Sequence, residues 1–225
     1  MQAFTPFLLA GIRNFQAETL CKVAVGVVVD ICSGIGGQIQ PFCDDIMGAL
    51  MECLRDGSVQ REIKPVVIAC FGDVAMAICG AYEPYLPTSV MLLMQASTQR
   101  APADDDELID FVNSLRLSIL EAYSGIIIGL SDGSKLHLFV TQLPNIMQFL
   151  EFLSREEALR DDDVLVKAVA LIGDIGQQLG NQPGVRQQVQ QQFVVTLITE
   201  AATCSDPSGK ELATWTHGVL AGLGQ

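Results

Sequence analysis

The stretch REIKPVVIACFGDVAMAICG, residues 61–80, decides the fold of this chain. Its apolar residues recur every three or four positions, which is the spacing of one helix face and not the alternation of a half-buried strand. They are Ile63, Val66, Val67, Cys70, Phe71, Val74, Ala75 and Ile78. The stretch therefore predicts a helix that buries one continuous apolar stripe.

The same periodicity recurs on both sides of this stretch, and no segment alternates convincingly as a strand. Counting an apolar helix at the N-terminus, the pattern predicts about ten helices in an all-α fold. The other stripes run over residues 20–35, 39–54, 90–94, 108–126, 143–150, 164–175, 185–197 and 212–223.

Glycine and proline divide these helices into a recurring order, in which a helix ending in glycine is soon followed by a proline and a second helix. The glycine and proline positions are Gly34, Gly36 and Gly37 with Pro41; Gly80 with Pro84 and Pro87; Gly129 and Gly133 with Pro144; and Gly180 with Pro183. An aspartate recurs within apolar surroundings at Asp30, Asp73 and Asp174, where we expect it to hydrogen-bond neighbouring helix ends.

A two-helix unit of 40 to 50 residues is the period of HEAT repeats. We therefore predict a right-handed HEAT-repeat α-solenoid, a superhelix of stacked antiparallel helix pairs. One array fills residues 1–225, with approximate units at 1–15 (partial), 16–56, 57–100, 101–155, 156–204 and 205–225 (terminal). The apolar start without a clear helix cap suggests a fragment of a longer solenoid.

Composition limits the classes of ligand. The net charge of −13 repels phosphate backbones and anionic lipid, so nucleic acid and membrane surfaces are poor partners and a basic protein segment is a better one. The longest uncharged run, residues 84–99, is too short to span a membrane. The seven cysteines form no CxxC pair and fall mostly on apolar stripes, which indicates small core residues in a reducing compartment. The methionines Met47, Met51, Met91 and Met94 are likewise expected in the core.

Catalytic motifs do not emerge from the sequence. His137 and His217 are the two histidines, and neither has a cysteine or acidic partner at metal-ligand spacing. Phosphate-binding loops, dinucleotide fingerprints and nucleophile elbows are missing as well. We therefore expect no enzyme activity, no metal and no cofactor.

The chain resembles the C-terminal part of the importin-β family of nuclear transport receptors. The likeness rests on IQPFCDDIM at 39–47, FGDVAMAI at 71–78, LEAYSGI at 120–126 and LIGDI at 171–175. Val29 stands where the family tends to have glycine, and the last helix lacks the family's basic tail.

The resemblance implies a nuclear import receptor segment found in cytoplasm, nucleus and nuclear pore. Its implied partners are the basic importin-β-binding domain of importin-α, phenylalanine-glycine nucleoporins in slots between outer helices, and the GTPase Ran, which binds mainly repeats absent here. The alternative is a structural HEAT scaffold subunit of a phosphatase or coat complex.

The candidate protein-binding residues are acidic side chains and one tryptophan. Asp44, Asp45 and Glu52 lie off the apolar stripe of residues 39–54, on a second helix of a pair, which lines the concave face in such solenoids. They suit a basic helix, and a solvated face carries equal weight. Trp215 matches a tryptophan in the family's last repeat that packs on the adaptor's basic helix, where cation–π attraction to arginine favours it. Its place on the stripe of 212–220 makes simple packing at least as good an interpretation.

Overall fold

The computed structural model describes residues 1–223 and contains helices without strands over that range. The α-helices are α1 (Thr5–Ile12), α2 (Glu18–Ile35), α3 (Cys43–Arg55), α4 (Lys64–Ile78), α5 (Leu86–Ser97), α6 (Asp106–Asp132), α7 (His137–Val140), α8 (Leu143–Arg155), α9 (Asp162–Leu179), α10 (Val185–Val189), α11 (Gln192–Thr203) and α12 (Pro207–Gly222). The predicted ten helices are confirmed, and α7 and α10 add about one turn each. The predicted stripe of 185–197 is broken at Gln190 and Gln191 into α10 and α11.

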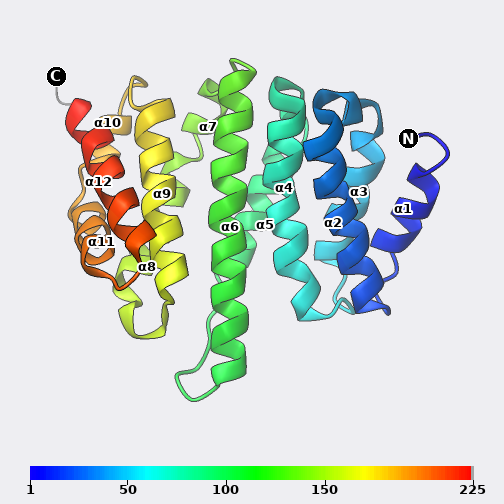
Figure 1. Ribbon diagram of the computed structural model, residues 1–225, viewed down its shortest axis with the longest axis horizontal. Coiled ribbons are helices and arrows are strands. Elements are labelled where there is room, and N and C mark those ends of the chain that lie inside the picture. The colour runs from blue at the N-terminus through cyan, green and yellow to red at the C-terminus, as the bar shows by residue number, and fades with distance from the viewer. Residues whose placement is uncertain (224–225) are drawn as a thin grey trace.

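The helices stack in two rows that run from the N-terminal to the C-terminal end of the molecule (Figure 1). The first row consists of α2, α4, α6, α9 and α12, each in contact with the next. The second row consists of α1, α3, α5, α8 and α11. In Figure 1, α3, α5 and α8 lie behind the first row, and α1 lies at the N-terminal edge. This arrangement is the α-solenoid that the periodicity predicts, because a helix with one apolar stripe is stable only when neighbours cover that stripe. The limits of the individual repeat units stay a prediction.

Helix ends follow the glycine and proline positions with three corrections. Gly36 ends α2 with φ of +52°, a conformation that glycine adopts without a side-chain penalty. Pro41 lies in a 3₁₀-helix, Gly36–Phe42, that precedes α3, and not in the first turn of a longer α-helix. Gly129 lies inside α6 and does not end it, because this helix continues to Asp132. Cys79, and not Gly80, is the residue that ends α4.

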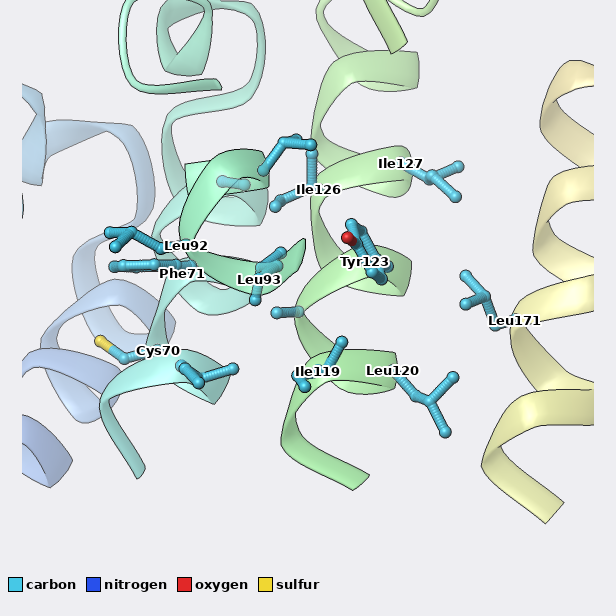
Figure 2. Packing of buried hydrophobic residues seen from close by; sticks show 14 of the residues in the cluster. Cys70, Phe71, Leu92, Leu93, Ile119, Leu120, Tyr123, Ile126, Ile127 and Leu171 are labelled. Atoms are coloured by element: carbon cyan, nitrogen blue, oxygen red, sulfur yellow. The ribbon is translucent and has the colours of Figure 1, made fainter. Parts of the chain in front are cut away.

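One continuous apolar core fills the space between the rows. Its centre lies where α4, α5 and α6 meet, with Phe71, Leu93 and Tyr123 almost fully buried (Figure 2). Five of the seven cysteines are buried in this core, as predicted: Cys21, Cys32, Cys43, Cys53 and Cys70. Burial raises the pKa of Cys43 to about 11 and that of Cys32 and Cys53 to about 12. These thiols are therefore packing residues and not nucleophiles at neutral pH.

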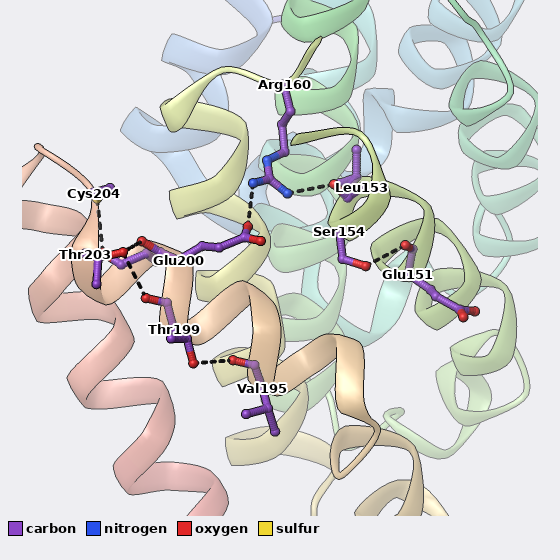
Figure 3. A network of polar contacts seen from close by, with 10 residues as sticks. Glu151, Leu153, Ser154, Arg160, Val195, Thr199, Glu200, Thr203 and Cys204 are labelled. Carbon is purple, nitrogen blue, oxygen red and sulfur yellow. Dashed lines mark hydrogen bonds and ion pairs between the residues drawn. The ribbon is translucent and has the colours of Figure 1, made fainter. Parts of the chain in front are cut away.

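Buried arginines hold α6, α8 and α11 together, and the apolar pattern gives no sign of them. Arg160 donates to the carbonyl oxygen of Leu153 at 2.6 Å and pairs with Glu200 at 2.7 Å (Figure 3). Arg116 pairs with Glu156 at 3.2 Å. The arginine side chains are 3% and 4% exposed, so their charges need these partners to remain in the protein interior.

Three helical stretches are long and apolar enough to cross a membrane by length and composition alone. They are Glu18–Arg55, Arg61–Tyr82 and Asp106–Asp132. The sequence prediction missed them because it measured only runs without charge. The apolar window is 56% buried in Arg61–Tyr82 and 67% buried in Asp106–Asp132, where solenoid packing accounts for the composition. It is 28% buried in Glu18–Arg55, where Leu20 and Val23 of α2 are exposed.

Candidate protein-binding surfaces

The three predicted acidic residues lie together on the exposed side of α3, in the second row. Asp44 and Asp45 occupy the first turn of this helix, where the positive end of the helix dipole favours carboxylates. Glu52 follows two turns later. We call Asp44, Asp45 and Glu52 the α3 acidic face. The structure brings these three residues to one surface, as the periodicity indicates.

Two of the three carboxylates already have partners within the chain. Arg13 Nε donates to Glu52 Oε2 at 2.8 Å, and this hydrogen bond lowers the pKa of Glu52. The hydroxyl of Tyr85 donates to Asp44 Oδ1 at 2.5 Å. Burial first, and then Asp44, raise the pKa of Tyr85, so this hydroxyl remains a donor at neutral pH. A basic ligand would exchange with Arg13 at Glu52. Asp45 is exposed. The hydrogen bond to Glu52 raises the pKa of Arg13, and the charge of Asp45 adds to this rise.

Trp215 lies in the first row, apart from the α3 acidic face. A Cβ atom added to Gly173 of α9 would stand 2.0 Å from Trp215 Cζ3, so the indole ring covers the space left by this glycine. The neighbouring Thr216 is buried and donates to the carbonyl oxygen of Val169 at 3.0 Å. Trp215 is nevertheless 36% exposed. The ring thus packs against α9 and also keeps part of its surface open to solvent.

A slot opens between α4 and α6 on the first row, with a volume of about 330 Å³. Its floor is made of small residues, because Gly72 and Gly125 let the two helices approach closely. Met76, which is 42% exposed, and Ile128 form its apolar sides. We call this space the α4–α6 slot.

Asp73 stands at the rim of the α4–α6 slot, and burial together with the nearby charge of Glu121 raises its pKa. Glu121 pairs with Lys167 at 3.2 Å across the same rim. The sequence prediction for the recurring aspartates needs correction, because Asp30 is exposed and Asp174 faces Ser124 in the middle of α6. Asp73 and Asp174 lie beside Glu121 and Ser124 of α6, because the helices of the first row lie side by side.

A groove runs between α5 and α8 on the second row. Two adjoining cavities of about 370 and 380 Å³ share Met94 and Thr98, and together they extend from Pro87 to Arg155. Met91 is 44% exposed in this groove, so the prediction that it belongs to the core is wrong. Met47 and Met51 are buried as predicted. Helical periodicity failed at Met91 because the second row is open between α5 and α8. We call this space the α5–α8 groove.

Among the described residues, no group of three or more histidine, cysteine, aspartate or glutamate side chains is arranged to hold a metal ion. The surfaces described above are an acidic helix face, a slot with a glycine floor and an apolar groove. Their geometry is that of a helical-repeat binding protein, in which stacked helices present extended surfaces to protein partners.

Comparisons with known proteins show which family of helical-repeat proteins this chain belongs to. Residues 1–202 match the family model described as importin subunit beta-1-like, TPR repeats. The chain is 35% identical over 219 residues to importin subunit beta-1 of Arabidopsis thaliana, covering 96% of this chain and 25% of that protein. The chain therefore belongs to the importin subunit beta-1 family. It spans about a quarter of the length of the curated relatives it matches.

Solved structures agree with this assignment. An importin beta crystal structure from a polyethylene glycol condition superposes with a TM-score of 0.92 at 30% identity, over 99% of this chain and 27% of that one. A Kap95:Nup1 complex gives a TM-score of 0.85 at 26% identity, over 99% and 26% of the two chains. A structure of Kap95p with RanGDP gives 0.86 at 26% identity, over 98% and 26%.

Proposed function

We propose that this chain is a segment of a nuclear import receptor and that its α3 acidic face binds the basic importin-β-binding segment of importin-α. The observation that carries the proposal is the α3 acidic face itself, exposed on the second row of a chain with a net charge of −13. Opposite charges speed the encounter between two proteins and suppress partners of the wrong charge. The receptor works between cytoplasm and nucleus and at the nuclear pore, and Ran engages mainly repeats outside this segment.

A titration of a fluorescent importin-β-binding peptide tests the acidic face. Asp45→Lys and Glu52→Lys should mainly slow association, and the affinity should fall as salt shortens the Debye length to about 8 Å near physiological ionic strength. Arg13→Ala should strengthen binding slightly, because it frees Glu52 from its partner at 2.8 Å. Glu107→Lys is the matched control, since this side chain is 90% exposed at the start of α6, outside the α3 acidic face. Equal effects of all three lysine variants would reject the α3 acidic face as the site.

Trp215 is a separate part of the proposal, because it lies in the other row and near the opposite end of the solenoid from α3 (Figure 1). The face of an indole ring attracts an arginine guanidinium, and Trp215 is 36% exposed, so it can meet an arginine of the same adaptor. Trp215→Ala should weaken binding by about 2 kcal/mol, a loss typical of an aromatic anchor, and the loss should appear as faster dissociation. If the variant lowers the melting temperature while its folded fraction keeps the dissociation rate, the residue only packs on α9.

We also propose that the α4–α6 slot accepts a phenylalanine of nucleoporin phenylalanine-glycine repeats. A glycine floor between two apolar walls suits a flat ring, and a structural relative of this chain is found in a Kap95:Nup1 complex. Met76→Glu should abolish binding of a phenylalanine-glycine peptide. Met91→Glu is the matched control, because this methionine is equally exposed but lies in the second row. Binding that survives Met76→Glu would exclude this slot.

The alternative is a scaffold subunit of a phosphatase or coat complex. Such a subunit contacts other subunits and requires neither the basic peptide nor the phenylalanine-glycine repeat. Failure of both peptides to bind a folded chain would favour the scaffold.

A further inference from the structure

The two ends of the α5–α8 groove differ in charge, whereas the α3 acidic face carries only carboxylates. The helices α5 and α8 run in the same direction along it, from Pro87 and Gln142 at their starts to Arg100 and Arg155 at their ends. The apolar lining, Val90, Met91, Met94, Phe149 and Phe152, extends along its length. The charged lining residues are Arg100, Glu151 and Arg155, and all three lie toward the same end. The groove is therefore lined by apolar and uncharged polar side chains along its length, the latter including Gln95, Asn145 and Gln148, and it is cationic at one end of a strongly acidic chain.

Arg100 is held in place at this cationic end. Its Nη1 donates to the carbonyl oxygens of Ser97 and Gln99, both at 2.8 Å. Its guanidinium carbon lies 3.5 Å from the centre of the Phe152 ring. An arginine fixed by stacking and by backbone contacts loses little side-chain freedom when it binds a carboxylate. The remaining donors of its guanidinium group are available to an anionic ligand.

Arg155 lies at the same end of the groove and is held less firmly than Arg100. Its side chain is 72% exposed and pairs with Glu151 on the preceding turn of α8. This contact is a surface ion pair, which is weak and exchanges readily with an incoming carboxylate. Arg100 and Arg155 together form a two-arginine end to an apolar groove.

The dimensions of the groove fit a short helix. The twelve residues of α5 extend about 18 Å at 1.5 Å per residue, which is the length of a helical peptide of about twelve residues. A helix in a groove is recognised by apolar side chains at positions i, i+3 or i+4 and i+7. Acidic residues in the first turn of such a helix are favoured by its own dipole. The bound helix therefore has its N-terminal turn at the arginine end of the groove and runs antiparallel to α5 and α8.

We propose that the α5–α8 groove is a second protein-binding site, which takes an amphipathic helix with an acidic N-terminal turn. The apolar face of this helix lies on Met91, Met94 and Phe149, and its carboxylates pair with Arg100 and Arg155. The site selects the opposite charge from the basic segment assigned to α3, so it binds a different partner. It does not depend on the proposed adaptor or nucleoporin binding.

Fluorescence anisotropy with three designed twelve-residue peptides tests the charge selection. The first peptide has leucines at the helix spacing and two glutamates in its first turn, the second has lysines instead of these glutamates, and the third has serines instead of the leucines. The first should bind the 225-residue chain about tenfold or more tighter than the other two. Equal or tighter binding of the lysine peptide, or no binding of any of them, overturns the proposal.

Variants of the chain place the first peptide in the groove. Met91→Glu and Arg155→Glu should each weaken binding about tenfold, and Glu151→Gln should strengthen it severalfold because it releases Arg155. Val23→Glu in α2, where the side chain is 57% exposed outside every proposed site, should leave binding unchanged, and far-UV circular dichroism of every variant should match that of the parent. Indistinguishable effects of Met91→Glu and Val23→Glu, or weaker binding by Glu151→Gln, would show that the peptide binds elsewhere.

Discussion

The helices α6 and α9 carry the same kind of glycine stripe, but their neighbours meet these stripes in different ways. The stripe of α6 and its end consists of Gly125, Gly129 and Gly133, and that of α9 and its end consists of Gly173, Gly176 and Gly180. Across α6 lies the backbone of α4 and of the turn that follows it, so that a Cβ at Gly125 would stand 2.6 Å from Gly72 Cα. Across α9 lie mostly side chains of α12, among them Trp215 and Leu220.

This difference indicates that the two junctions differ in how well they tolerate a side chain added at a glycine. Backbone atoms packed against backbone atoms have no rotamer that relieves a clash, whereas a side chain has several. The α4–α6 junction is therefore rigid and also forms the floor of the α4–α6 slot. The α9–α12 junction is adjustable, and its covering residue, Trp215, is 36% exposed.

The largest effect is expected for Gly129→Ala. Its new Cβ would stand 2.2 Å from the carbonyl oxygen of Ala75 in α4, so the two helices must separate. We expect the free energy of unfolding in urea to fall by about 3 kcal/mol or more, the upper range for overpacking. Gly26→Ala is the control, since no atom lies within 4 Å of that position, and it should stabilise α2 by about 0.8 kcal/mol. Similar losses in the two variants would contradict the backbone contact.

Gly173→Ala should cost less, although its Cβ would stand only 2.0 Å from Trp215 Cζ3. The indole ring is 36% exposed and can rotate outward, so we expect a loss of about 1 to 2 kcal/mol. The chain has one tryptophan, and its fluorescence should shift to longer wavelength as the ring leaves α9. An unchanged emission with a loss as large as that of Gly129→Ala would show that both junctions are equally rigid.

Cys79→Gly should stabilise the rigid junction. Cys79 ends α4 with φ of +51° and ψ of −128°, nearly the same angles as Gly36 at the end of α2, which are +52° and −134°. A side chain in this region of backbone space costs about 1 kcal/mol or more, and glycine removes that cost. We expect a gain of about 1 kcal/mol in chemical unfolding, and Gly36→Ala should lose a similar amount. Destabilisation by Cys79→Gly would mean that the thiol contributes more than the strain costs.

The smallest effect concerns Asp174, at the junction between α6 and α9. Burial raises its pKa above the ordinary value of 3.8, so the folded chain binds this proton more tightly than the unfolded chain does. The contribution of this group to stability therefore falls as the pH rises through the raised pKa. Asp174→Asn should raise the melting temperature at neutral pH, and the difference should shrink as the pH falls toward 3.8.

Asp30→Asn is the control for this pH dependence, because Asp30 recurs at the equivalent position of α2 but is exposed. We expect no change of melting temperature for it at either pH. If both variants raise the melting temperature by the same amount, burial of Asp174 is not the cause.

The sequence by itself determined the fold class, the number of long helices and the family. Apolar spacing depends only on which residues share one face of a helix, and the long helices inside the stack bury such a face. The terminal α12 leaves Trp215 exposed and Leu212, Val219 and Leu220 half-buried. The glycine at the end of α2 was also predictable, because few residues other than glycine adopt its backbone angles. The α3 acidic face follows from the same periodicity, since residues off the stripe point away from the core.

Only the tertiary structure decided what each face meets. Periodicity contains no information on the neighbouring helix, so it could not pair Glu52 with Arg13 or Tyr85 with Asp44. It placed Met91 in the core because the gap between α5 and α8 depends on how two distant segments pack. The buried pairs of Arg116 and Arg160 were invisible for the same reason, because their partners lie about 40 residues away along the chain. The glycines of α6 and α9 look alike in sequence, and the distinction between them arises from backbone or side chains across the junction.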